Sequence, residues 1–322
     1  MLSNSAKANS EPNVKKISSW HSGKQKERFK LFLIALPFLC LVFLFAYLPL
    51  YGWLYAFYYY EPPLKLSQCT FAGLHWFQYL VSNTVQVKTI LNVLRNTFAI
   101  SGLGILTSWV PMVFAIFLTE IKSGKVRKVI QTCTTLPNFI SWVLVYSIAY
   151  ALFSYNGPIN NLLTSMNIIP SNINWLAQDN HTWLAMTLWG MWKGTGWGAI
   201  LYMAAIAGID QELYEAAAVD GAGRFRMIWN ITLPELLPTY FVLLVLSIAN
   251  FLNNGFDQYY VFQNSFNQEH IQVLDLYVYN LGIGSSSFSL ATAIGILKSF
   301  VSIVLLTLAN RASKCIRGST VI

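Results

Sequence analysis

The chain has 322 residues, of which 55% are hydrophobic and only 11% are charged. Soluble domains contain about 25% Asp, Glu, Lys and Arg, so this chain has too little charge for a solvated surface. Its mean hydropathy of +0.48 points to lipid as the solvent and excludes a disordered chain, a disulfide scaffold and collagen. The net charge of +8 would fit nucleic-acid binding in a soluble protein, so the positions of the basic residues are decisive.

Long apolar stretches predict an all-α integral membrane protein. A helix that crosses a hydrocarbon core of ~30 Å needs about 20 mainly apolar residues, because its backbone polar groups must bond within the segment. The predicted transmembrane helices, six in all, are residues 31–57, 96–119, 129–153, 183–207, 239–254 and 288–310. The fifth has a short apolar run that passes into Asn253 and Asn254.

The basic residues predict the topology. With the N-terminus inside, an even number of spans returns the C-terminus to the inside, and most Lys and Arg residues then lie in the inner tails and loops. This is the positive-inside pattern, so the basic charge reports orientation and argues against nucleic acid. The expected organisation is a basic cytoplasmic tail (1–30), a six-helix transmembrane domain (31–310) and a cytoplasmic C-terminal tail (311–322).

No catalytic or metal-binding pattern is present in the sequence. The four cysteines and four histidines are dispersed, and no Cys-x-x-Cys pair, His-Glu-x-x-His, Gly-x-Ser-x-Gly or phosphate-binding glycine loop occurs. We therefore expect no enzyme activity, no metal and no cofactor on this chain.

The inner loop between the fourth and fifth predicted spans has clear local signals. Asp210 can cap a short helix, Glu212 suits its positive first turn, and Gly221 can adopt the left-handed conformation that ends it. A second short helix is expected from about Phe225, closed by Leu233 and Pro234. The alternative is an amphipathic connector without a specific role.

The spacing in this loop resembles the EAA motif of ATP-binding cassette (ABC) importer permeases. The matching positions are Glu215, Ala216, Ala217, Asp220, Gly221, Ala222, Ile231, Leu233 and Pro234. The resemblance implies a type I importer permease fold, with a cytoplasmic coupling helix between helices 4 and 5 in a loop of residues 208–238. In that family this helix docks in a groove of the ATPase, a helix-in-groove contact. Glu215 would contact the ATPase, the two alanines would permit close approach, and Gly221 would set the turn.

Further segments resemble permeases of carbohydrate importers, particularly those for complex or acidic oligosaccharides such as alginate or pectin fragments. These segments are residues 47–52, 94–98, 136–142, 192–197, 291–296 and 309–310. The resemblance implies a bacterial cytoplasmic membrane location, a second homologous permease, two ATPase subunits that bind ATP and Mg²⁺, and an extracytoplasmic solute-binding protein. That protein would deliver the saccharide to loops such as residues 156–180.

Two lysines within predicted spans are candidate substrate-pathway residues. Lys193 shares a helix face with Trp189 and has Trp197 at the edge of that face. Indole rings stack on sugar rings and an ammonium pairs with a carboxylate, so these residues and Lys298 favour an anionic saccharide. The alternatives are that the tryptophans pack between helices and that the lysines pair with a carbonyl or an acid, or snorkel.

Span five carries a second candidate stripe of amides and a carboxylate. Asn250, Asn253, Asn254 and Asp257 recur at helical spacing toward its outer end. Such groups suit hydroxyl-rich ligands, but they could equally cap the span or bond between helices.

The sequence thus favours the permease subunit of an oligosaccharide importer, driven by ATP hydrolysis on a separate subunit. An ABC importer for a non-sugar solute is the nearest alternative. A secondary transporter or channel would leave the spacing from Glu215 to Pro234 unexplained. A membrane-embedded enzyme would need a cluster of acids or histidines, which the sequence lacks.

Overall fold

The structure, a computed structural model, describes residues 14–177 and 179–317. This part of the chain is helical, with one isolated bridge between Tyr58 and Phe71 and no strand. The outer parts of the two predicted tails, residues 1–13 and 318–322, lie outside the described residues. The chain divides into two compact units, residues 1–54 and 55–322.

The first unit is one long helical segment. It consists of α1 (Val14–Val42), a π-helical turn η1 (Phe43–Tyr47) and the start of the 3-10 segment η2 (Leu48–Phe57). The helix begins within the predicted basic tail and continues into the predicted first span. From Leu31 it is apolar on all sides, as expected for a helix in lipid.

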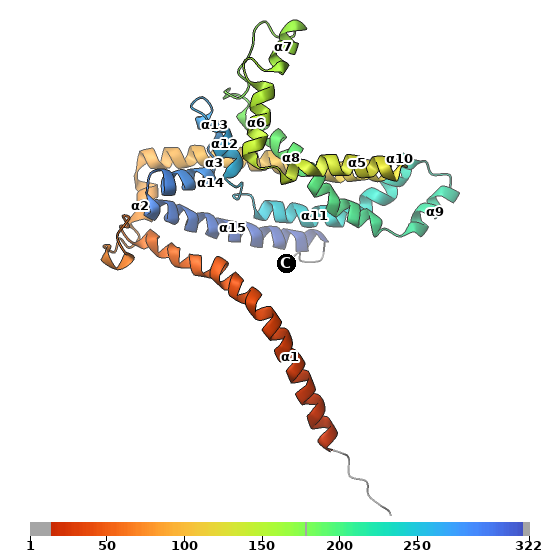
Figure 1. Cartoon of the computed structure of the whole chain (residues 1–322), viewed down its shortest axis with the longest axis horizontal. Helices are drawn as coiled ribbons and strands as arrows, with labels where there is room; N and C mark the ends of the chain where they lie inside the picture. The colour runs from red at the N-terminus through yellow and green to blue at the C-terminus, as the bar shows by residue number, and fades with distance from the viewer. Residues whose placement is uncertain (1–13, 178, 318–322) are drawn as a thin grey trace, which may run out of the picture. The chain divides into compact units, whose positions relative to one another are not determined.

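The second unit is an assembly of helices joined by short turns (Figure 1). Its elements after η2 are η3 (Leu66–Gln68), α2 (His75–Ser82), α3 (Thr84–Leu106), α4 (Val110–Thr119), α5 (Gly124–Thr135), η4 (Leu136–Phe139), α6 (Trp142–Phe153), α7 (Pro158–Ser165), α8 (Thr182–Ala207), α9 (Gln211–Val219), α10 (Arg224–Met227), η5 (Ile228–Thr232), α11 (Leu233–Ala249), α12 (Asp257–Phe262), α13 (Gln268–Ile271), α14 (Leu274–Tyr279), η6 (Asn280–Gly284) and α15 (Phe288–Arg317).

Four helical segments among the described residues are long and apolar enough to cross a membrane. They are Glu27–Phe57, Thr84–Thr119, Arg224–Ala249 and Phe288–Arg311. A bent pair of helices could provide a fifth crossing. Helix α8 matches the predicted fourth span in position and has 26 residues, but its glycines and lysine make it less apolar. The count of six spans therefore stays a prediction.

The third predicted span is wrong as a single straight helix. Gly124–Phe139 and Trp142–Ser165 are bent by 107° at the break between them. Pro137 has no N–H to donate and lies in the 3-10 turn that ends the first part. Ser141 then caps α6, its Oγ accepting from the Leu144 N–H at 3.4 Å. Hydropathy reads through such a break because both sides of it are apolar.

Two other predicted spans have different ends in the structure. The second begins at Thr84 instead of residue 96, because the Asn83 side chain accepts from the N–H groups of Val85 and Gln86 and caps α3. The fifth ends at Ala249, so Asn253 and Asn254 follow the helix instead of lying on it. Asn83 is therefore the cap of α3, and Asn253 and Asn254 lie in the turn that follows α11.

Three hydrophobic clusters form the core of the second unit. One joins α3, α6, α8 and α12 to the segment 271–276, another joins α2, α3, α14 and α15, and the third joins α4, α8 and α11. Helix α8 contributes to two of them, with α4 packed along it and α11 packed along α15. Helices α3, α8 and α11 also border the cavity described next, and Ile100 and Met186 belong both to the first cluster and to the cavity wall.

Candidate functional site

An open cavity of about 410 Å³ lies between four parts of the second unit. Its walls come from α3 with the start of α4, the middle of α8, the end of α11, and the start of α12. The polar side chains that line it are Ser101, Thr107, Ser108, Thr187, Thr195, Ser247, Asn250, Asn253, Asn254, Gln258 and Tyr259. None of the lining residues, all within the described ranges, is charged.

The hydroxyl groups of this wall are held in place by the backbone. Thr187, Thr195 and Ser247 each donate to the carbonyl four residues earlier, at 2.8, 2.6 and 2.9 Å. A hydroxyl that donates in this way keeps lone pairs free to accept. The cavity therefore offers fixed acceptors, which suit a ligand rich in hydroxyl donors.

The segment after α11, residues 250–255, forms a turn that we call the Asn turn. Asn254 Nδ2 donates to Ser101 Oγ at 2.8 Å, and Ser101 Oγ donates to the Phe251 carbonyl at 2.5 Å. Asn253 Nδ2 donates to Asn250 Oδ1 at 3.3 Å. The turn is thereby tied to α3, and it presents three asparagines to the cavity.

Glycines keep the cavity open. Gly104 on α3 and Gly190 and Gly194 on α8 line it. A Cβ placed on Gly104 or Gly194 would meet no other atom within 4 Å, so these positions face free space. By contrast, a Cβ on Gly196 would come within 2.1 Å of the Thr134 carbonyl, because α8 and α5 approach closely there.

A second cavity of about 300 Å³ continues the first toward Tyr202 and Tyr240. The two share Gly104, Ser108 and other lining residues, and Ser108 Oγ lies 3.2 Å from Tyr240 Oη. Together they form a track along α3, α4, α8 and α11.

The predicted sugar-stacking residues lie outside the polar cavity. Lys193 Nζ donates to the carbonyls of Asn138 at 2.7 Å and Pro137 at 3.1 Å, at the bend between η4 and α6. Trp189 packs edge-on against aromatic neighbours and lines a separate apolar pocket. Trp197 contacts Phe139 edge-on. The carbonyl alternative for Lys193 matches this geometry, and the substrate roles of these three residues stay predictions.

Lys298 forms an ion pair with Asp275 of α14, and their side chains are only 15% and 18% exposed. Neither residue lines the cavity. Asp257 is exposed at the start of α12 and does not line the cavity either, whereas the next residue, Gln258, does. Neither Lys193 nor Lys298 lines this cavity, so the cavity does not support the prediction that these lysines select an anionic saccharide.

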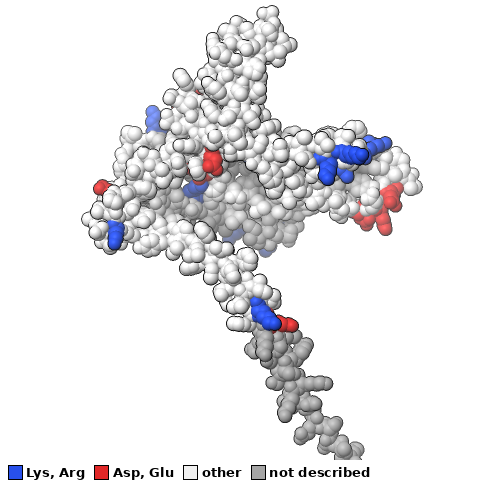
Figure 2. Space-filling model, viewed as in Figure 1, with Lys and Arg blue, Asp and Glu red and all other residues white. Residues whose placement is uncertain are grey.

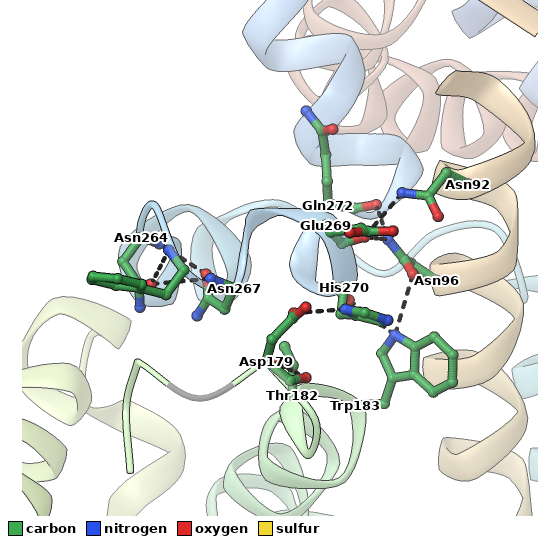
Figure 3. Close-up of polar contacts among 11 residues, drawn as sticks. Asn92, Asn96, Asp179, Thr182, Trp183, Asn264, Asn267, Glu269, His270 and Gln272 are labelled. Carbon is green, nitrogen blue, oxygen red and sulfur yellow. Dashed lines mark hydrogen bonds and ion pairs between the residues drawn. The ribbon is translucent and has the colours of Figure 1, made fainter. Parts of the chain in front are cut away.

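A polar network fixes the segment around α13 to α3 and α8 (Figure 3). Asn96 is fully buried, and its Nδ2 donates to the carbonyls of Glu269 at 2.8 Å and Gln272 at 3.2 Å. Trp183 Nε1 donates to the His270 carbonyl at 2.9 Å and to Asn96 Oδ1 at 3.3 Å. These bonds supply donors to the carbonyls of residues 269, 270 and 272, and they hold α13 against α3 and α8.

An asparagine also ties α7 to the segment that follows it, within the predicted delivery loop of residues 156–180. Asn160 is fully buried on α7, where its Nδ2 donates to the Ile173 carbonyl at 2.7 Å and its Oδ1 accepts from Trp175 Nε1 at 3.0 Å. Delivery of a saccharide to this loop stays a prediction.

The coupling loop has the local structure that its sequence indicates. Asp210 Oδ1 accepts from the Glu212 N–H at 3.0 Å and caps α9, and Gly221 has a φ of +74° after the helix ends. Glu215, Ala216 and Asp220 are exposed; Ala217 and Ala222 are half-buried. Figure 2 shows a patch of acidic residues at α9, below the basic residues of α5 and α10.

The second half of the loop differs from the prediction. Leu233 and Pro234 do not close a short helix, because α10, η5 and α11 run on as one segment. In the π-turn the Leu233 N–H donates to the Ile228 carbonyl, five residues earlier. The wider turn contains one more residue than an α-helical turn and so makes room for the Pro234 ring. Ile231 lies within the π-turn.

Several residues of the cavity and of the coupling loop were not predicted from the sequence. Ser101 and Gln258 line the cavity, but single polar residues in apolar stretches carry no motif. Val219, Phe225 and Trp229 in the loop are 89%, 83% and 71% exposed. Large apolar side chains in such a loop indicate a contact with another protein, and this signal is visible in the sequence. Among the described residues, no group of His, Cys, Asp and Glu could hold a metal ion.

Comparison with known proteins places the chain among transport proteins. Residues 111–315 match the family described as binding-protein-dependent transport system inner membrane component. Protein LplB of Bacillus subtilis is 38% identical over 92% of both chains. The polygalacturonan/rhamnogalacturonan transport system permease protein YteP of the same organism is 36% identical over 88% of this chain and 87% of that protein. A chain of the bacterial alginate ABC transporter, solved with an alginate pentasaccharide-bound periplasmic protein, matches with a TM-score of 0.81 and 31% identity over 92% of this chain and 98% of that one.

Proposed function

Because the chain belongs to the family of binding-protein-dependent transport system inner membrane components, we propose that its polar cavity is part of a saccharide pathway. The chain is the permease subunit of an ABC importer for oligosaccharides and is not an enzyme. Its task is to bind differently in two states and to open on alternate sides of the membrane.

One observation carries this proposal. The helical segment Arg224–Ala249 begins at the coupling loop and ends at the Asn turn in the cavity wall. Its 26 residues correspond to about 39 Å at the helical rise of 1.5 Å per residue. A displacement of the loop by an ATPase would therefore reach the cavity wall through one continuous element.

The cavity chemistry supports a saccharide. Its volume lies in the range of ligand sites, and its hydroxyls and amides match a chain of sugar hydroxyls. YteP is named for the transport of polygalacturonan and rhamnogalacturonan, and the alginate transporter is described as importing an acidic polysaccharide. Since the described lining of this cavity has no cation, we expect this chain to recognise sugar hydroxyls, with any uronate carboxylate matched by another subunit.

The partners follow from the same proposal. The ATPase would dock on α9, through Glu215 and the exposed Val219, and on the following α10 and η5, through the exposed Phe225 and Trp229. ATP and Mg²⁺ would be held by two ATPase subunits. A second homologous permease would close the other side of the pathway, and a solute-binding protein would deliver the saccharide. Both termini would be cytoplasmic in the bacterial inner membrane.

The test starts with purification of the tagged chain from its native membrane in mild detergent and identification of its partners by mass spectrometry. The complex is then reconstituted in liposomes with its binding protein, and uptake of oligogalacturonides, alginate oligosaccharides and maltose is measured with and without ATP. We expect an ATPase, a second permease and ATP-dependent uptake of a saccharide. A chain that purifies alone and transports without ATP would refute the proposal.

Variants locate the pathway within the complex. Asn253→Ala removes an amide from the cavity and should reduce uptake while the complex still assembles. Gln78→Ala removes an exposed amide on α2, outside the cavity, and serves as the matched control with normal uptake. Equal uptake by both variants would argue against this cavity as the pathway.

A further inference from the structure

Gly255 ends the Asn turn and has a φ of +72°, a conformation that side chains disfavour. Its backbone N–H is bonded from outside the turn. Asp275 Oδ2 accepts this N–H at 2.9 Å, although the two residues are 20 positions apart. The carboxylate thus holds the end of the turn from the side of α14.

Asp275 is itself held by Lys298 of α15. The lysine ammonium bonds the other carboxylate oxygen, Oδ1, and both side chains are largely buried. A buried carboxylate without a counter-ion is strongly unfavourable, so the lysine is what allows a charged acceptor at this position. The chain of contacts runs from α15 through Asp275 to Gly255.

The opposite side of the turn faces the cavity and α3. Asn254 lines the cavity and donates to Ser101 Oγ at 2.8 Å. Asn254 and Gly255 are adjacent, so the direction of the Asn254 side chain depends on how the Gly255 peptide is held. Neither Asp275 nor Lys298 lines the cavity, so neither would contact a ligand there.

We infer that Asp275 is a positioning residue for the saccharide pathway, which holds Asn254 toward the cavity through the Gly255 N–H with Lys298 as its counter-ion. This inference rests on the proposed function. Lys298 then contributes to transport without contacting the substrate. Transport requires a hydrogen-bond acceptor at position 275, and it does not require a negative charge there.

The competing explanation is that the ion pair only joins α14 to α15. Two double variants separate the explanations, since both remove the two charges. Asp275→Asn with Lys298→Met keeps an acceptor for the Gly255 N–H, whereas Asp275→Leu with Lys298→Met does not. Neutral replacements of a buried pair are tolerated in general, so both chains should fold.

The experiment uses the reconstituted complex with its binding protein and measures the amount of saccharide transported per ATP hydrolysed, with oligogalacturonides and maltose as probes. We expect the Asn/Met variant to stay within twofold of the unmodified complex and the Leu/Met variant to fall about tenfold, as for loss of one hydrogen bond to a charged group. Asn254→Ala should fall similarly, and adding it to the Leu/Met variant should cause no further loss, because both changes act on the same side chain. Gln78→Ala, which changes an exposed residue outside the cavity, should leave the ratio unchanged.

Three results would overturn the inference. Equal ratios for the Asn/Met and Leu/Met variants would leave the pair with a packing role only, and additive losses with Asn254→Ala would show that the two sites act separately. If Asn254→Ala itself had no effect on uptake of any saccharide, the cavity would not be the pathway, and the proposed function of the cavity would fall together with the inference.

Discussion

Two glycines on α8 allow the close packing of this helix to be measured with a matched pair of variants. Gly194→Ala and Gly196→Ala add the same methyl group to the same helix, two residues apart. At position 194 the new Cβ meets nothing within 4 Å, whereas at position 196 it would lie 2.1 Å from the Thr134 carbonyl oxygen and 2.7 Å from the Thr135 nitrogen. The atoms in the way are backbone, so no side chain can rotate to make room.

The difference between the two variants isolates the cost of this contact. Replacing glycine by alanine in a helix stabilises by about 1 kcal/mol at either position. Overpacking in a tight interface costs about 1–3 kcal/mol, and more where backbone must move. We therefore expect Gly194→Ala to be neutral or stabilising and Gly196→Ala to be less stable than it by at least about 2 kcal/mol.

Thermal unfolding of the purified complex in detergent gives the comparison, with unmodified protein as the reference. Gly196→Ala should unfold at a lower temperature than Gly194→Ala, and it should also reduce uptake, because α5 moves away from α8 beside the bend that Lys193 holds. Equal unfolding temperatures would contradict the close approach of α8 to α5 and the packing argument built on it.

Three further predictions follow from single residues. Asn96→Leu leaves the Gln272 carbonyl without this donor, whereas the Glu269 carbonyl still accepts from Asn92, and should destabilise the complex by roughly 1–3 kcal/mol, measured as a lower unfolding temperature; an unchanged temperature would contradict the network of Figure 3. Lys193→Met loses charged hydrogen bonds at the bend and should reduce uptake of neutral and acidic oligosaccharides equally in a competition assay, whereas a selective loss for acidic ones would restore its role as a substrate ligand. Gly221→Ala forces a side chain into a φ of +74°, at a cost of about 1–2 kcal/mol, and should lower ATP-dependent uptake more than it lowers the yield of the complex; normal uptake would separate this turn from coupling.

The sequence predicted the parts of the structure that depend on neighbours in the chain. The Asp210 cap, the left-handed Gly221 and the position of α8 follow from local signals within a few residues. The EAA spacing identified the family because a coupling helix must present fixed positions to another protein. Local rules were therefore sufficient for the coupling loop up to Gly221.

The cavity could not be predicted in the same way. Lys193 bonds carbonyls 55 and 56 residues away, and Lys298 pairs with a carboxylate 23 residues away, so these partners could not be identified from neighbouring residues in the sequence. The asparagines near residue 250 were noticed as a helical stripe, but they line the cavity from a turn after the helix ends at Ala249. Hydropathy averages over the bend at Pro137, since both flanks are apolar.

The central claim is that saccharide passes through the polar cavity of this chain. Gly194→Trp tests it most directly, because position 194 lines the cavity and has no atom within 4 Å of an added Cβ, so a large side chain enters free space. ATP-dependent uptake of labelled oligosaccharide is measured in liposomes that contain the complete complex, alongside Gly194→Ala and the yield of assembled complex. We expect both variants to assemble into the complex, with uptake abolished by tryptophan and retained with alanine. Normal uptake with tryptophan at this position would contradict it.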